Sequence, residues 1–71
     1  MQFRVIVMAN LMLIRNDIGA RLPTMDEAAR RREINILQRQ RADISRDAEM
    51  DIRLKAGIME YIQGTIDMVG A

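Results

Sequence analysis

The chain has 71 residues, a formal net charge of +1, and neither cysteine nor histidine. Disulfides are therefore excluded, and a structural zinc site would lack its usual sulfur and imidazole ligands. A chain this short buries only a marginal core, so close helix packing or self-association has to supply the remaining stability.

The first predicted element covers residues 3–22 and is interpreted as a helix over about residues 3–18. Apolar side chains recur there at steps of three or four residues, which places them along one side of a helix. These are Val7, Leu11, Ile14, Ile18 and Leu22. Further apolar residues fill the other sides, and a helix of that kind is normally buried by its neighbours. A short strand is the alternative, because Val and Ile favour strands, but the chain offers no second strand-like segment to pair with it.

Gly19 and Pro23 mark the end of this element. Glycine readily takes the left-handed conformation that ends many helices, and proline is excluded from helix interiors. The sequence therefore predicts a turn from Gly19 to Pro23.

The apolar run at residues 5–14 is about half as long as the roughly 20 residues that a membrane-spanning helix needs. No small-residue cleavage site of the secretory type follows it. We therefore expect no membrane partner and a cytoplasmic location. Two interpretations of the run stay open, since it packs either inside the protein or on a partner.

A capping box is predicted at residues 24–27. The Thr24 hydroxyl would accept a hydrogen bond from the third amide, and Glu27 would reach back to the Thr24 amide. Four i, i+4 ion pairs are expected to support the helix that follows. They are Asp26–Arg30, Glu27–Arg31, Glu49–Arg53 and Asp51–Lys55.

The helix that begins there is predicted to continue to about Met68, because no proline interrupts it and its first glycine is Gly57. At about 1.5 Å per residue this helix would be roughly 66 Å long. A compact domain of this size has a radius of gyration of only about 11 Å, so a helix of that length must break or find a partner outside its own chain. The alternative is a break near residues 43–46, where Asp43 or Ser45 could begin a new helix. That break would give three helices, at about 3–18, 25–43 and 46–68.

A seam of apolar positions follows this helix at coiled-coil spacing and is predicted to form a dimer interface. The predicted seam consists of Ile34, Leu37, Arg41, Ile44, Ala48, Ile52, Lys55, Met59, Ile62 and Ile66. Arg41 and Lys55 interrupt it, and we expect their long side chains to reach out from the edge of the seam to water. The charge changes from basic before Ala42 to acidic after it. Two antiparallel copies crossing near Ala42 would therefore place Arg39 and Arg41 against Asp43 and Asp47.

Catalytic chemistry has few residues to build on. The chain has one serine and one lysine, and it contains no nucleophile elbow, phosphate-binding glycine loop or metalloprotease motif. We expect no enzyme activity, no cofactor and no metal.

An arginine-rich segment at residues 30–41 is the main candidate for contact with phosphate. It contains Arg30, Arg31, Arg32, Arg39 and Arg41. Consecutive residues of a helix point about 100° apart, so these side chains do not form one continuous patch. No aromatic residue lies nearby for base stacking. Nucleic acid is therefore the weaker of the two expected partners, behind another protein.

The sequence as a whole predicts an all-α fold: a single helical domain over residues 1–71, folded as a hairpin with an aliphatic core. The expected function is that of a small homodimeric regulator or inhibitor that binds another protein through helical surfaces. A DNA-binding transcriptional regulator or antitoxin that uses residues 30–41 is the first alternative. A structural subunit of a larger assembly, such as a viral one, is the second.

Overall fold

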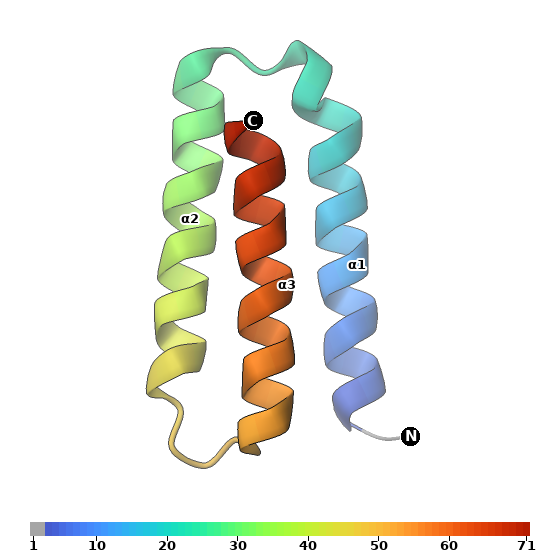
Figure 1. The fold of residues 1–71 in the computed structure, drawn as a ribbon. Coiled ribbons are helices and arrows are strands. Elements are labelled where there is room, and N and C mark those ends of the chain that lie inside the picture. The colour runs from blue at the N-terminus through green and yellow to red at the C-terminus, as the bar shows by residue number, and fades with distance from the viewer. Residues whose placement is uncertain (1–2) are drawn as a thin grey trace.

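The fold is all-α, as predicted. The computed structural model describes the backbone of residues 3–71 and the side chains of residues 8–71. Three helices are present in this part of the chain, α1 (Phe3–Arg21), α2 (Glu27–Arg46) and α3 (Ile52–Gly70), with a short 3₁₀ turn, η1 (Leu22–Thr24), after α1. Successive helices run antiparallel, and α3 lies between α1 and α2 (Figure 1).

Helix α1 runs past Gly19 and ends at Arg21, so the prediction that Gly19 ends it in a left-handed conformation is wrong. No glycine in the described residues has a positive φ. Pro23 is what stops the helix, because it lacks an amide hydrogen and fits instead into the first turn of η1. The Thr24 hydroxyl donates to the Arg21 carbonyl oxygen at 2.8 Å, which satisfies one of the free carbonyls at the helix end.

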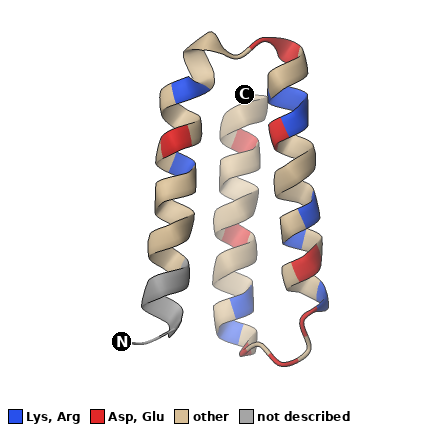
Figure 2. Ribbon diagram, turned by 180° about the vertical axis from the view of Figure 1, so that it is seen from behind, with Lys and Arg blue, Asp and Glu red and all other residues tan. Residues whose placement is uncertain are grey.

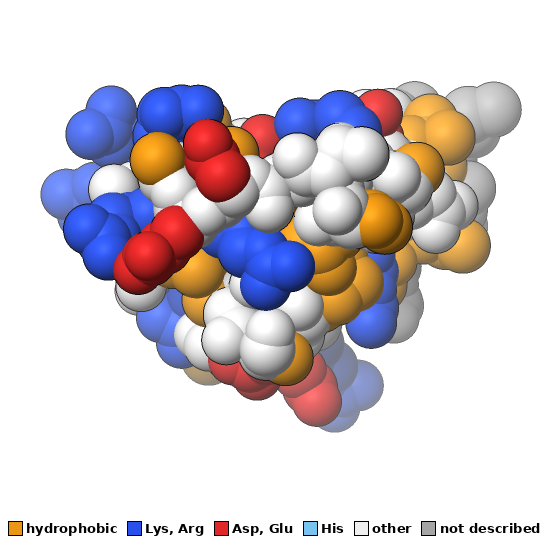
Figure 3. All heavy atoms as spheres, turned by 90° about the horizontal axis from the view of Figure 1, so that it is seen from above, with side chains coloured by type: hydrophobic (Ala, Val, Ile, Leu, Met, Phe, Trp, Pro, Cys, Tyr) orange, Lys and Arg blue, Asp and Glu red, His pale blue; other side chains and the backbone are white. Residues whose placement is uncertain are grey.

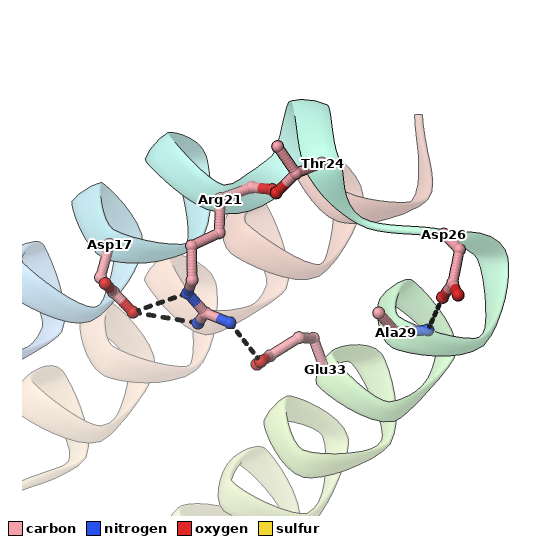
Figure 4. A network of polar contacts seen from close by, with 6 residues as sticks. All are labelled: Asp17, Arg21, Thr24, Asp26, Ala29 and Glu33. Atoms are coloured by element: carbon pink, nitrogen blue, oxygen red, sulfur yellow. Dashed lines mark hydrogen bonds and ion pairs between the residues drawn. The ribbon is translucent and has the colours of Figure 1, made fainter.

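The N-cap of helix α2 lies two residues after Thr24, the predicted N-cap. Asp26 is its N-cap, and the Asp26 carboxylate accepts from the Ala29 amide at 2.7 Å (Figure 4). The prediction for Thr24 fails because its hydroxyl already serves the end of α1. The predicted Glu27–Arg31 ion pair is confirmed at 3.1 Å.

Helices α2 and α3 are separated by residues 47–51, so the preferred prediction of one continuous helix is wrong and the three-helix alternative holds. Two aspartates make this break without glycine or proline. The Asp47 carboxylate accepts from the amides of Glu49 and Met50 at 3.0 and 3.2 Å, and that of Asp51 accepts from the Leu54 amide at 3.1 Å. Aspartate side chains compete with the helix for backbone donors in this way. The break lies a few residues after the predicted 43–46.

Replacing Asp51 with alanine is expected to lower the free energy of unfolding by about 0.5 to 2 kcal/mol, the usual cost of losing an N-cap. The matched control is Asp51→Asn, which removes the charge but keeps a good capping acceptor. Urea denaturation followed by circular dichroism measures both variants. Equal losses for the two would show that the negative charge matters and the cap does not.

Folding back at residues 47–51 buries an aliphatic core, as predicted. Ile18 of α1 and Leu37 of α2 pack against four residues of α3. These four are Ile58, Ile62, Ile66 and Val69. The one buried polar side chain of the described residues, Thr65, donates to the Tyr61 carbonyl oxygen at 3.0 Å. Helix α3 is thus the centre of the fold, in contact with both other helices.

The helices form an open array and not a tight bundle. The Cα extents are 37 × 24 × 14 Å, and the radius of gyration is 12.7 Å. A compact chain of this length has a radius of gyration of about 11 Å. Helices α1 and α2 both pack on α3 and touch each other much less. No helix within residues 3–71 is long and apolar enough to span a membrane.

Two glycines in the middle of α3 give a second test of the fold. A Cβ added at Gly57 or Gly64 would meet nothing within 4 Å. Alanine at each position is expected to raise the free energy of unfolding by about 0.5 to 1 kcal/mol, because glycine weakens helix interiors. The reverse change, Ala56→Gly on the same helix, is expected to lower it by a similar amount. A loss of stability in Gly57→Ala or Gly64→Ala, measured by thermal unfolding, would contradict the open space found there.

Candidate functional site

An apolar groove lies between α1 and α2, with a volume of about 260 Å³. Its walls and floor come from all three helices, and we call it the α1–α2 groove. It is lined by Leu11 and Ile14 of α1, Gln40, Asp43 and Ile44 of α2, and Ile58 and Ile62 of α3. Figure 2 shows the molecule from behind, with α3 set back between the two outer helices.

An ion pair joins α1 to α2 near η1, seven residues along each helix from the groove-lining Ile14 and Gln40. Arg21 donates from Nε to the Asp17 carboxylate of its own helix at 3.1 Å, and from Nη1 to the Glu33 carboxylate of α2 at 3.3 Å (Figure 4). The hydrogen bond to Asp17 raises the pKa of Arg21 above its ordinary value; desolvation opposes this, and the hydrogen bond to Glu33 raises the pKa further. This end of the array is therefore held by charged groups, and the groove beyond it is apolar.

Several large apolar side chains of α1 and α2 are exposed to solvent. On α1, Met12, Leu13 and Ile14 are 52%, 67% and 39% exposed. On α2, Ile36 is 52% exposed and shares a helix side with Gln40 and Asp43, which follow four and seven residues later. Viewed from above, hydrophobic side chains are visible over the α1 side of the molecule, and charged ones gather over α2 (Figure 3).

Leu13 and Ile36 were not among the predicted site residues, whereas Ile14 belongs to the predicted α1 stripe. The signal was present, because three consecutive apolar residues on a helix point in three directions and one neighbouring helix cannot cover them all. Of the predicted α1 stripe, Ile18 is buried, Leu11 and Leu22 pack against the core, and Ile14 is partly exposed. The side chain of Val7 lies outside the described residues.

The predicted seam is largely used within a single chain, where α2 packs on α3. Leu37, Ile62 and Ile66 are buried in the core, and Ile34 and Ile44 pack against it. Met59 is half-buried, whereas Ala48 and Ile52 are exposed. In this conformation the three buried side chains are not available to a second chain.

The two charged residues of the seam have different environments. Lys55 is half-buried. Its ammonium group donates a hydrogen bond to the exposed Ser45 carbonyl oxygen at 3.3 Å, so the charge lies at the edge of the seam. Arg41 is also half-buried, and its buried Nε has no hydrogen-bond acceptor among the described residues.

Pairing of the acidic block with arginines of a second copy, as the sequence suggested, would compete with local contacts. Asp43 binds Arg46 at 2.9 Å, and Asp47 accepts from the two loop amides described above.

The arginine-rich segment does not form one patch. Arg30 and Arg41 are half-buried on the inner side of α2, while Arg31, Arg32 and Arg39 are exposed. Arg32, Arg39 and Arg46 follow one another at steps of seven residues, so Arg46, which was not among the predicted contact residues, continues the outer side of α2. Basic residues thus follow the length of α2 (Figure 2).

Residues suited to metal binding do not gather in the part of the chain that the structure describes. No group of three or more Asp and Glu side chains there could hold a metal ion. The hollows found among residues 8–71 open to solvent.

Comparison with family models, with curated proteins and with solved structures finds no match for this chain. Function is therefore inferred from the chain's own residues.

Proposed function

We propose that this chain is a cytoplasmic, non-catalytic interaction protein that works as a homodimer and regulates or inhibits another protein. The observation that carries this proposal is its large surface. The chain exposes 5254 Å². A typical monomer of 8.2 kDa exposes only about 4,500 Å².

The chain therefore exposes about 700 Å² more than this average, summed over the whole molecule. Apolar side chains contribute to it, since Leu13 is 67% and Ile36 52% exposed. Large exposed apolar patches mark protein-binding sites more often than they occur on free monomers. The lack of cysteine and histidine supports a role without catalysis.

The homodimer is tested by sedimentation equilibrium at micromolar concentration, where the expected mass is twice the 8.2 kDa of one chain. A mass of one chain that stays constant up to about 100 µM would overturn this part of the proposal. The regulatory role is tested by affinity capture from the native host with identification of the co-purifying material. Recovery of a defined protein in fixed proportion supports that role, and recovery of nucleic acid alone would contradict it.

Nucleic-acid binding is the second candidate function, favoured by the exposed arginines along the outer side of α2. Arg31 and Arg46 are each engaged by a carboxylate of their own helix, Glu27 and Asp43. Contacts to phosphate would weaken steeply between about 50 and 200 mM salt, whereas an aliphatic protein interface would respond little. Titration of labelled duplex DNA at these two salt concentrations separates the two functions.

A further inference from the structure

We infer that the outer side of α2 binds duplex DNA and that this helix enters the major groove. The surface, which we call the α2 arginine row, consists of Arg32, Asn35, Arg39, Ala42 and Arg46. The inference rests on the second candidate function and assigns its binding site. It depends neither on the homodimer nor on the α1–α2 groove.

The α2 arginine row is one continuous side of the helix. Its members follow one another at steps of three or four residues, and all five are exposed. A step of seven residues turns a helix by about 700°, only about 20° short of two full turns. The three arginines therefore lie in line, on the side of α2 that is opposite to the buried Leu37.

Positive charge is concentrated on this helix. Helix α2 carries six arginines and three carboxylates, a net charge of +3 in a chain whose net charge is +1. Each of the three carboxylates already binds an arginine, in the pairs Glu27–Arg31, Glu33–Arg21 and Asp43–Arg46. None of the ion pairs and side-chain hydrogen bonds within residues 8–71 involves Arg32 or Arg39. Two guanidinium groups of the row are thus available to an external anion.

The composition of the row favours nucleic acid over an acidic protein. No large apolar side chain belongs to it, and the nearest, Ile36, lies toward the α1–α2 groove. Exposed ion pairs contribute little to protein association, which depends on an apolar interface core depleted in charged residues. Protein–DNA interfaces are instead polar and strongly positive. Phosphates follow one another closely along a duplex, so several arginines of one helix can be engaged together.

The shape of the row fits the major groove of DNA. A helix with its side chains is about 10–12 Å wide, and the groove is about 12 Å wide. Only Asn35 and Ala42 stand between the arginines, and their small side chains let the helix approach the base edges. Arginine binds the edge of guanine through two hydrogen bonds, and asparagine binds that of adenine in the same way.

Other nucleic acids fit this surface less well. Duplex RNA has a deep, narrow major groove that side chains cannot read. Single strands are bound largely by stacking on aromatic side chains, and α2 has none. The row therefore matches duplex DNA best.

The surroundings of the row define the limits of the contact. Helix α2 is one of the two outer helices of the array, so its outer side is open to a large ligand (Figure 1). Arg31, Gln38 and Ser45 form a second exposed line at steps of seven residues beside the row, and their side chains can donate to phosphates. The acidic residues of the segment 47–51 follow α2, so the contact is expected to end near Arg46.

The test compares Arg39→Gln with Arg53→Gln by fluorescence anisotropy of a labelled DNA duplex of about 20 base pairs at about 50 mM salt. Each change removes one exposed arginine, but Arg53 belongs to α3. Arg39→Gln is expected to raise the dissociation constant at least about fivefold, the lower limit for one arginine–base contact. Arg53→Gln is expected to raise it less than about twofold, because a charge outside the contact is screened by salt. Circular dichroism checks that both variants keep the helical content of the wild type.

A second pair of variants tests entry into the groove without changing charge. Ala42→Leu places a bulky side chain between the arginines and is expected to raise the dissociation constant at least about fivefold. Ala56→Leu, at an exposed alanine of α3, is the control and is expected to leave the constant unchanged. The same pair is measured with an RNA duplex of the same sequence, which is expected to bind more weakly than the DNA.

The outcomes separate this inference from the proposed homodimer. No binding of the DNA duplex at up to about 100 µM protein would overturn the inference, and sedimentation equilibrium would still decide the homodimer. Equal effects of Arg39→Gln and Arg53→Gln would overturn the assigned surface. Equal affinity for DNA and RNA, or an Ala42→Leu variant that binds as the wild type does, would overturn entry into the major groove.

Discussion

Replacing Ile58 with alanine is expected to lower the free energy of unfolding by about 2 to 5 kcal/mol, the range for truncating a buried isoleucine. Ile58 is 1% exposed, belongs to the core, and forms part of the floor of the α1–α2 groove. A chain of this length has a total stability of only about 4 to 10 kcal/mol. The variant is therefore expected to be close to the limit of folding, which urea denaturation at 25 °C measures.

Ile52→Ala is the matched control on the same helix. Ile52 is 78% exposed, so its truncation is expected to change stability by no more than about 0.5 kcal/mol. Both variants have to be measured at one protein concentration, because association stabilises the folded state in proportion to concentration. Similar losses at positions 52 and 58 would contradict the packing described for α3.

Replacing Ile18 with alanine is the second change with a large expected effect, again about 2 to 5 kcal/mol. Ile18 is 2% exposed and is the one buried side chain of α1 between Met8 and Arg21. Helix α1 packs mainly on α3, and the larger contact of the fold is the one between α2 and α3. Loss of Ile18 should therefore release α1 before it disturbs the α2–α3 pair.

Hydrogen exchange measures this difference directly, because elements open separately when few buried contacts hold them. In Ile18→Ala the amides of α1 are expected to lose protection more than those of α2 and α3. Met12→Ala, at a position 52% exposed on the same helix, is the control and is expected to leave the pattern unchanged. An equal loss of protection in all three helices would show that α1 is an integral part of one cooperative unit.

The class of the fold and the composition of its core could be predicted because they depend on periodicity. Ile34, Leu37 and Ile44 recur at helical spacing, and so do Ile62 and Ile66. Such spacing marks the side of a helix that must be covered. It does not say by what. Leu37, Ile62 and Ile66 of the predicted seam are buried between α2 and α3 of one chain, and spacing alone does not distinguish this cover from cover by a second chain.

The break after Arg46 could not be predicted from composition, because residues 47–51 include neither glycine nor proline. Two side-chain caps make it, at Asp47 and Asp51, and each contributes only about 1 kcal/mol. Burial of the α2–α3 contact adds much more, so tertiary packing decides where local preferences are nearly balanced. Gly19 shows the same limit of local sequence signals. It lies inside α1, because a glycine is tolerated in a helix that packs against neighbouring helices.

The α1–α2 groove could be predicted only in part. The abundance of apolar side chains on residues 5–14 indicated that this helix needs cover on several sides. Which side stays open depends on how α1 and α2 divide the surface of α3, and Leu13 and Ile36 become neighbours of the groove only through that packing.

The most direct test of the arrangement is the distance between Ala28 and Gly70, measured by electron paramagnetic resonance between spin labels on cysteines at these two positions. Gly70 lies against Ile34 of α2, where an added Cβ would be 3.8 Å from the Ile34 Cδ1 atom. Doubly labelled chains diluted in unlabelled chains report the distance within one chain. The folded-back arrangement requires a distance of less than about 25 Å, because both residues lie at the same end of the array, within one or two helix diameters. A distance of about 63 Å, the length of about 42 helical residues, would contradict the folded-back arrangement and support one continuous helix between these two positions.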